Sequence, residues 1–538
     1  MPERRPLGHL LGRRTERSAP PVRSARRRLT SLVAGLAALA LAATACGGSS
    51  GDSGGGKGDT LTLVTMSPPA SLDPAKSNVG SDNWFVNLSY DSILRRGSDA
   101  KVGPGLATQW GYVGTGNTDF EFTLREGAKF SDGTPVTAEA VAASLNYGRK
   151  NGLNVSWTSA IESVTATGPL TVRIHCSTPN PILPDLLTQI TLYGSVISPA
   201  GLADPARMGS QSFGAGPYVL DTKATVTGDH YTYTPNPHYW DKSKVHWKKV
   251  VIKVIPNPQS ALQAVRTGQA DAMSVLSNQV DTAKSAGLEI TKAPVILMGV
   301  NLVDRGGALS APLKDVRVRQ ALNHAVDRDA INKALFQDYG QSTTQLSLPG
   351  LDGYSAAVDG RYPYDPDLAK RLLAEAGYPD GFALELETQG LAGIDLVTQA
   401  VVEQWKRVGV RANVTTDTTV GQWLGNATSK KFAALGFGYG GIPTYMVALD
   451  WMLPHATAFN PFASEDPELT KRLAAAAAAP ADQQAPLYQE AMRYAVDQAW
   501  FVATSRLDGI YAYNGKKITG FSTGPGYLPD VAWETTAK

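Results

Sequence analysis

The sequence predicts an α/β protein built from layered strands and helices. Segments with strand periodicity alternate with amphipathic segments of helical period, and short loops join them, most clearly over residues 383–415. Such alternation is typical of α/β domains, in which helices cover a sheet. The length of 538 residues allows about three domains of ordinary size. With 43% hydrophobic and 18% charged residues, the composition suits a chain that buries sizeable cores.

The beginning of the chain has the composition of an export signal. Residues 4–28 are rich in arginine, and the apolar run that follows, residues 29–43, is shorter than the roughly 20 residues of a membrane-spanning helix. Small residues precede Cys46, which resembles the cleavage site of a bacterial lipoprotein. We therefore expect residues 1–45 to be a lipoprotein signal peptide and Cys46 to carry a lipid anchor on the outer face of the cytoplasmic membrane. The three arginines at 26–28 leave the twin-arginine export route open beside the general one.

The positive formal charge of the chain comes from this signal. The whole sequence has a net charge of +2, but residues 1–45 contain nine Arg and two Glu. The rest of the chain has 41 basic and 46 acidic residues, so the mature protein is mildly acidic. This balance argues against nucleic acid as a partner.

A Gly/Ser-rich segment follows the predicted anchor. Residues 46–58 are expected to form a flexible tether. The tether contains Gly51-Asp52-Ser53-Gly54-Gly55, which matches the nucleophile motif of trypsin-like proteases. That serine works only in a folded barrel with a histidine and an aspartate upstream, and the only upstream histidine is His9 in the signal. We expect no enzymatic activity; a hydrolase would predict labelling of Ser53 by serine reagents.

Cysteine and histidine give no sign of a metal centre. The two cysteines are Cys46 and Cys176, and neither a CxxC nor an HExxH motif occurs in the sequence. The seven histidines are scattered, and only His230 and His238 lie close together in the chain. We expect no metal site and no cofactor.

The first half of the mature chain contains a strand, a turn and a capped helix in a clear order. Alternating apolar residues predict a strand at 61–65, and residues 81–94 have helical character. A second alternation at 120–124 is followed by an Asp-Gly turn at 132–133. Thr137 is a good N-cap for the helix that begins there.

Later elements repeat the alternation. The further predicted strands are residues 170–174, 250–255, 300–302, 383–387 and 410–415, and the further predicted helices are residues 261–269, 315–328, 368–376, 396–408, 474–479 and 487–500. No internal repeat is visible.

The strand, turn and helix at residues 120–148 also resemble a family signature. The residues that carry the likeness are Leu124-Arg125-Glu126-Gly127, Lys129-Phe130 and Asp132-Gly133-Thr134-Pro135-Val136-Thr137-Ala138-Glu139. They are similar to the signature of family 5 extracellular solute-binding proteins, the dipeptide, oligopeptide and nickel type that serve ABC importers. Further likeness extends from about residue 61 to 521, for example at Asn236-Pro237-His238-Tyr239-Trp240 and Arg317-Val318-Arg319-Gln320-Ala321-Leu322.

The resemblance implies a type II periplasmic-binding-protein fold, with two lobes around a cleft and an additional domain in the first lobe. Lobe 1 would comprise residues 59–95, 212–299 and 503–538. The additional domain would be residues 96–211, and lobe 2 would be residues 300–502.

The resemblance also implies a ligand-contacting loop. Residues 433–445 read as a strand that runs into a glycine-rich aromatic loop, and in the family this loop reaches the ligand. Peptide-binding members commonly place an aspartate in it, because a buried ammonium group needs a charged partner. Here the matching positions are Gly440, Gly441 and Ile442, and no carboxylate follows until Asp450. Asp450 or another acid could replace the missing aspartate; alternatively, the ligand is uncharged or hydroxylated.

We select candidate ligand-binding residues by their position at strand ends or by their aromatic character. These are Met66, Ser67, Pro68, Trp84, Trp423, Phe437, Tyr439, Gly440, Gly441, Tyr445 and Asp450. An alternative for each is an ordinary packing role in the core or at the lobe interface.

The expected function is that of a lipid-anchored receptor of an ABC importer. It would be a monomer that binds a small molecule or peptide and delivers it to permease subunits. Oligopeptide is the favoured ligand class because of its frequency in the family. The alternatives are an oligosaccharide, a metal chelate such as nickel, or a surface signalling module with the same cleft.

Overall fold

The structure is a computed structural model that describes residues 59–391 and 393–538. The predictions for the signal peptide, Cys46, the tether and Ser53 lie outside these residues. The described residues belong to one compact unit. None of the helices in this part of the chain is long and apolar enough to cross a lipid bilayer.

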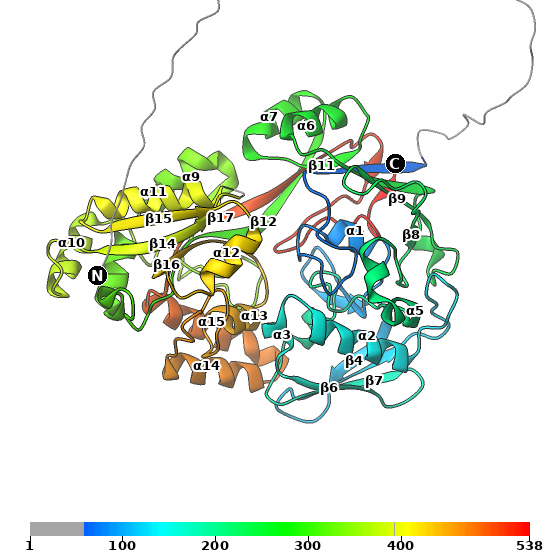
Figure 1. Cartoon of the computed structure of the whole chain (residues 1–538), viewed down its shortest axis with the longest axis horizontal. Helices are drawn as coiled ribbons and strands as arrows, with labels where there is room; N and C mark the ends of the chain where they lie inside the picture. Colours follow the sequence, from blue (N-terminus) through cyan, green and yellow to red (C-terminus); the bar gives the residue numbers. More distant parts are fainter. Residues whose placement is uncertain (1–58, 392) are drawn as a thin grey trace, which may run out of the picture. The chain divides into compact units, whose positions relative to one another are not determined.

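A long mixed sheet runs through the unit and contributes strands to both lobes (Figure 1). Its strand order is β15-β14-β16-β12-β17-β11-β1-β10-β9-β8, with β13 (Gly340–Ser342) paired to β17 beside this path. With the boundaries predicted from the sequence, the strands assigned to lobe 1 are β1 (Thr60–Thr65), β8 (Tyr218–Leu220), β9 (His230–Pro235), β10 (Lys249–Val254) and β11 (Ala272–Ser274). The strands of lobe 2 are β14 (Ala383–Gln389), β15 (Arg411–Asp417) and β16 (Ala434–Gly440).

Two long antiparallel strands connect the lobes. They are β12 (Glu289–Leu302) and β17 (Phe501–Tyr513), which pair with each other along almost their whole length. β12 also pairs with β16 of lobe 2, and β17 also pairs with β11 of lobe 1. Two register shifts interrupt the β12–β17 ladder, between Pro294 and Ile296 and between Met298 and Gly299. Such bulges bend a strand and re-aim its side chains, which matters for the cavity described below.

The additional domain has a four-stranded sheet of its own, in the order β4-β5-β7-β6. Its elements are β4 (Ala107–Tyr112), β5 (Asp119–Leu124), α2 (Ala138–Asn151), α3 (Val155–Thr158), β6 (Ile161–Ala166), β7 (Thr171–Cys176), α4 (Leu183–Leu186) and α5 (Pro199–Ala203). Phe120, Phe122 and Leu124 of β5 are all buried, as their alternation with polar residues predicts.

Helices cover both lobes. Lobe 1 has α1 (Asn83–Asn87), α6 (Pro258–Arg266) and α7 (Val280–Ser285). Lobe 2 has α8 (Val316–His324), α9 (Arg328–Leu335), α10 (Pro366–Glu375), α11 (Ile394–Lys406), α12 (Val420–Ala427), α13 (Thr444–Trp451), α14 (Pro467–Ala478) and α15 (Ala481–Asp497). Short strands complete the chain: β2 (Leu94–Arg96), β3 (Val102–Pro104), β18 (Ile518–Thr519) and β19 (Thr536–Ala537).

Local sequence signals explain where several of these helices begin and end. The hydroxyl of Thr137 accepts a hydrogen bond from the Ala140 amide at 3.3 Å, which confirms the predicted cap of α2. The carboxylate of Asp365 caps α10 through the Leu368 amide at 2.7 Å. The chain leaves α10 at Gly377, whose φ of 95° favours glycine.

One predicted helix is much shorter in the structure. Residues 81–94 were expected to be helical, but α1 contains only Asn83–Asn87, and Leu94 begins β2. The reason is tertiary packing. Residues 88 and 89 bond to Tyr218 and Gly216 through their carbonyl oxygens, so they serve as a loop against the lobe 1 sheet.

Candidate ligand-binding site

A cavity of about 410 Å³ lies where the shared strands meet both lobes. This volume falls in the range of roughly 300–1,000 Å³ that is usual for small-molecule sites. The lining residues from lobe 1 and the shared strands are Val79, Gly80, Ser81, Asn83, Ile190, Ser274, Val295, Ile296, Met298, Gly509, Tyr511, Gly526 and Leu528. Those from lobe 2 are Ile394, Gly438, Tyr439, Gly440, Gly441 and Ile442.

The lobe 2 wall is largely bare backbone. Gly438 and Gly440 alternate along β16, so they face the same side of the sheet. A Cβ atom on Gly438 would lie 2.7 Å from Ile394 Cδ1, and Ile394 itself lines the cavity. A Cβ atom on Gly440 would have no neighbour within 4 Å. Because Gly438 and Gly440 have no side chains, space remains beside β16, and this space is part of the cavity.

The same stretch of β16 has one free edge. β14 pairs with β16 only at Leu386–Ala434 and Glu387–Leu435. From residue 436 to 440, β12 is the only strand partner of β16 among the described residues. Unpaired main-chain groups on such an edge can bind an extended ligand backbone.

The lobe 1 wall is held in place by a network of side chains. The side-chain amide of Asn83 donates to the carbonyl oxygens of Gln189 at 2.8 Å and Ile190 at 3.0 Å. The Asp82 carboxylate accepts hydrogen bonds from the Asn78 amide at 2.8 Å, the Ser81 hydroxyl at 2.9 Å and the Ala70 amide at 3.1 Å. The side chains of Asp82 and Asn83 are buried, and their hydrogen bonds hold the loop in place. Asp82 therefore offers no free carboxylate to a ligand.

Two hydroxyl groups remain available in the cavity. Neither Ser274 nor Tyr511 uses its side-chain oxygen in a hydrogen bond with another described residue, and both line the cavity. Burial raises the pKa of Tyr511, so its hydroxyl stays protonated and can donate. These hydroxyls and the bare β16 backbone are the polar groups best placed to orient a ligand.

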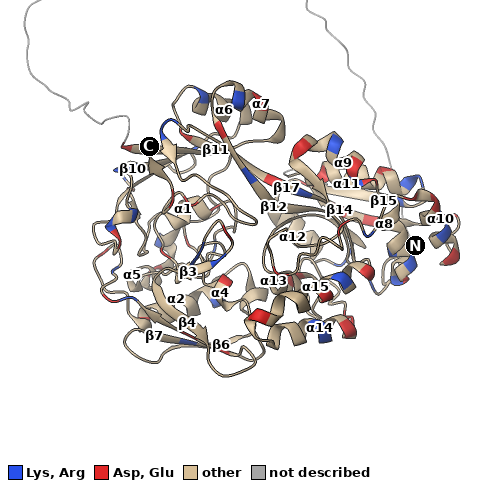
Figure 2. Cartoon of the chain, turned by 180° about the vertical axis from the view of Figure 1, so that it is seen from behind, with Lys and Arg blue, Asp and Glu red and all other residues tan. Residues whose placement is uncertain are grey.

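The cavity has no charged lining. None of the described residues that line it is Asp, Glu, Lys, Arg or His. Figure 2 shows charged residues on helices such as α9, α10 and α14, none of which contributes to the lining. An isolated ionised group that entered this cavity would lose its hydration without gaining a charged partner, which is costly.

Three of the residues selected from the sequence line the cavity: Tyr439, Gly440 and Gly441. Three others lie in the core instead. Trp84 is buried and donates from Nε1 to the Pro529 carbonyl at 2.9 Å. Phe437 packs edge-on against Trp451, and Trp423 packs against Phe459.

The remaining selected residues also lie outside the lining. Met66, Ser67 and Pro68 follow β1 without reaching the cavity, and Tyr445 faces a different hollow between α13 and the additional domain. Asp450 is 9% exposed and accepts three hydrogen bonds. Burial raises the pKa of Asp450, and the hydrogen bonds oppose that rise.

Several lining residues were not selected from the sequence. Ser274 ends β11, so the strand-end reasoning that selected Met66 applies equally to it. Gly509 and Tyr511 lie in β17, within residues 503–538, which were predicted from the sequence to belong to lobe 1. Residues 295–298 lie at the bulges of β12, for which the sequence gives no clear signal.

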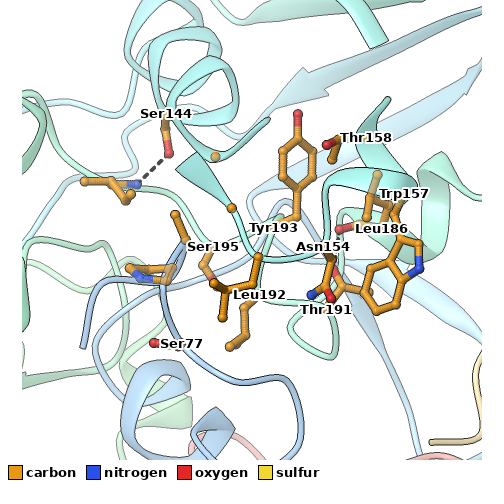
Figure 3. Close-up of a pocket in the computed structure, with 16 residues that line it drawn as sticks. Ser77, Ser144, Asn154, Trp157, Thr158, Leu186, Thr191, Leu192, Tyr193 and Ser195 are labelled. Atoms are coloured by element: carbon orange, nitrogen blue, oxygen red, sulfur yellow. Dashed lines mark hydrogen bonds between the residues drawn. The ribbon is translucent and has the colours of Figure 1, made fainter. Parts of the chain in front are cut away.

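A second cavity, shown in Figure 3, is too small for a solute. Its volume is about 30 Å³, close to the share of one water molecule, and its lining includes Tyr193, Ser195 and Trp157. Ser144 at its edge accepts a hydrogen bond from the Ile197 amide at 2.9 Å. No group of three or more His, Cys, Asp or Glu side chains suited to a metal ion occurs within residues 59–391 and 393–538.

Comparison with protein families identifies a match over most of the chain. Residues 101–461 match the family described as bacterial extracellular solute-binding proteins, family 5 Middle. Among curated proteins, the glutathione-binding protein GsiB of Salmonella typhimurium is 27% identical over 355 residues, which cover 64% of this chain and 67% of GsiB. Heme-binding protein A of Haemophilus influenzae is 28% identical over 398 residues, which cover 66% of this chain and 70% of that protein.

Solved structures show the same fold. The binding protein AgaA of A. tumefaciens R10, in complex with agropinic acid, has a TM-score of 0.76 at 23% identity, covering 89% of this chain and 99% of AgaA. DppA of Helicobacter pylori, in complex with the peptide STSA, has a TM-score of 0.75 at 19% identity, with coverage of 89% and 99%. These likenesses confirm the predicted two-lobed α/β architecture.

Proposed function

Because the chain belongs to family 5 of the bacterial extracellular solute-binding proteins, we propose that it is the receptor of an ABC importer for a small, electrically neutral solute. Members of this family are extracytoplasmic and bind ligands for ABC permeases; they are binding proteins and not enzymes. The ligand would bind in the 410 Å³ cavity between the lobes and be released to the permease when the lobes open.

The observation that carries the neutral ligand class is the uncharged lining of the cavity. A free peptide has an ammonium group and a carboxylate, and each would need a partner once buried. Asp82 and Asp450 are both occupied by other hydrogen bonds. A ligand without free charges avoids this desolvation cost.

Within this class we favour an oligopeptide whose ends are blocked or joined in a ring. The free edge of β16 offers main-chain hydrogen bonds of the kind that bind extended peptides. The relatives carry names for chemically different ligands, namely glutathione, heme, agropinic acid and a peptide, so family membership does not choose among them. An oligosaccharide remains the second candidate, supported by the hydroxyls of Ser274 and Tyr511. A metal chelate and a signalling role are weaker alternatives.

We also propose that Cys46 carries the lipid anchor and that residues 46–58 tether the binding unit to the outer face of the cytoplasmic membrane. The domain boundaries predicted from the sequence, with the additional domain at residues 96–211 and lobe 2 at 300–502, are part of the same proposal. Mass spectrometry of the protein isolated from its cells should detect acyl chains on Cys46. A chain that begins elsewhere without lipid would contradict the anchor.

A thermal-shift panel tests the ligand class. We expect end-blocked or cyclic peptides to raise the melting temperature of the purified protein more than free peptides, oligosaccharides or nickel chelates. A ligand at a hundredfold excess over its Kd adds about 2.7 kcal/mol to the free energy of unfolding, which is easily measured. A larger shift with free peptides would contradict the neutral class, and a shift with oligosaccharides alone would replace the peptide with a sugar.

A further inference from the structure

Asp450 lies at the contact between the lobes, away from the ligand cavity. It belongs to α13 of lobe 2, which packs against α3 of the additional domain (Figure 1). The Ser156 hydroxyl donates to one oxygen of Asp450 at 2.6 Å, and Trp157 Nε1 donates to the other at 3.2 Å. Two groups of lobe 1 therefore bind one carboxylate of lobe 2.

The third donor to Asp450 comes from the wall of the ligand cavity. The Tyr439 hydroxyl donates to Asp450 at 2.6 Å, and Tyr439 lines the cavity on β16. The Tyr439 ring is fixed by edge-on contacts with Trp451 and Phe459, at centroid distances of 5.2 and 5.0 Å. A displacement of this part of β16 therefore moves the group that orients the Asp450 carboxylate.

The surroundings of Asp450 make these hydrogen bonds effective. One continuous apolar cluster contains Trp157 and Leu186 of lobe 1 together with Tyr445, Leu449 and Tyr488 of lobe 2. A hollow lined by Ser156 and Trp157 lies beside this contact, but Asp450 itself is only 9% exposed, and hydrogen bonds to a buried charged acceptor are strong. When the lobes separate, the carboxylate exchanges two protein donors for water.

We propose that Asp450 is a positioning residue that couples the wall of the ligand cavity to lobe closure. It receives Tyr439 from the cavity wall and Ser156 with Trp157 from the opposite lobe, and so favours the closed arrangement. The inference rests on the proposed function, because closure around a solute is what the coupling would serve. Asp450 thereby has a role that is different from direct contact with a ligand ammonium group.

The test measures the closed fraction of the purified protein without any ligand, by small-angle X-ray scattering and by fluorescence energy transfer between dyes on the two lobes. In Asp450→Asn, we expect the ratio of closed to open molecules to fall about tenfold, the effect of losing one hydrogen bond to a charged acceptor. The double variant Ser156→Ala, Trp157→Phe removes both donors of lobe 1 and should lower the ratio of closed to open molecules by at least as much. It keeps the test usable if Asp450→Asn does not fold.

Two further variants separate coupling from ordinary packing. Ser159→Ala is the matched control, because the Ser159 hydroxyl is exposed and donates only to the Ser156 carbonyl within its own lobe. Tyr439→Phe removes the link to the cavity wall and should also lower the closed fraction.

A fall in melting temperature with an unchanged closed fraction would assign Asp450 a structural role and overturn the proposal, as would a wild-type protein that is fully open. An unchanged closed fraction in Tyr439→Phe would also overturn it, because Asp450 would then be a lobe contact without coupling. Since no ligand is used, failure here is distinct from failure of the import function.

Discussion

Replacing Gly440 with tryptophan is expected to weaken binding of the ligand by at least a hundredfold. Gly440 lines the cavity, and a Cβ atom there has no neighbour within 4 Å, so the indole can enter the cavity without displacing backbone. The side chain would occupy the volume that the ligand needs. Calorimetric titration with the ligand selected by the thermal-shift panel measures the loss.

The control for this variant is Gly111→Trp. Gly111 lies in β4 of the additional domain, does not line the cavity, and also has no neighbour within 4 Å of a Cβ atom. Both variants should keep the melting temperature of the ligand-free protein, because substitutions in open space usually change stability by less than about 0.5 kcal/mol. Wild-type affinity in Gly440→Trp would show that the ligand binds elsewhere.

Replacing Glu387 with glutamine is expected to stabilise the protein above neutral pH. Glu387 lies in β14, is fully buried, and neither of its carboxylate oxygens accepts a hydrogen bond from a described donor. Its neighbour Asp417 accepts two hydrogen bonds from the Asn426 amide, at 3.1 and 3.0 Å. Burial, and then the Asp417 carboxylate, raise the pKa of Glu387 to about 9.

The sign of the pH dependence follows from this shift. The folded protein holds the Glu387 proton up to about pH 9, whereas the unfolded chain releases it near the ordinary value of 4.5. Between these values the folded state binds more protons, so stability is greatest at the acid end and falls as the pH rises. The glutamine side chain stays uncharged at every pH, and its amide can donate an N–H to Asp417. At pH 8 we expect a gain of a few kcal/mol, which is about 2–4 °C for an unfolding unit of this size.

Melting curves from pH 5 to 9 check this prediction. The wild-type melting temperature should fall toward alkaline pH more steeply than that of Glu387→Gln. Glu385→Gln is the control, because Glu385 is exposed on the same strand and accepts a hydrogen bond from the Asn413 amide at 2.7 Å. Parallel curves for wild type and Glu387→Gln would mean that Glu387 is ionised in the folded protein.

Local sequence patterns were sufficient to predict most of the secondary structure. The alternation at residues 120–124 and the cap at Thr137 depend on neighbouring residues, and the structure has both as expected. The prediction of a helix over residues 81–94 was wrong, because main-chain hydrogen bonds to residues more than a hundred positions away compete with the helix that the local composition favours. Such tertiary contacts override the intrinsic helix propensity of a segment.

The site was only partly predictable for a similar reason. The glycine-rich end of β16 identifies Gly440 and Gly441 because missing side chains are visible in the sequence. Aromatic character could not separate Tyr439, which lines the cavity, from Trp84, whose indole is buried against the Pro529 carbonyl. Two of the three partners of the Asp450 carboxylate come from α3, nearly 300 residues earlier in the chain, so no local pattern reveals how fully the carboxylate is occupied.

The central claim is that the cavity between the lobes binds a solute without free charges. It is tested most directly by calorimetric titration of the purified protein with Leu-Leu and with the same dipeptide acetylated at one end and amidated at the other. We predict that the blocked peptide binds at least tenfold more tightly, because it buries no unpaired charge in the uncharged cavity. Equal or tighter binding of free Leu-Leu, or no binding of the blocked peptide, would contradict the claim.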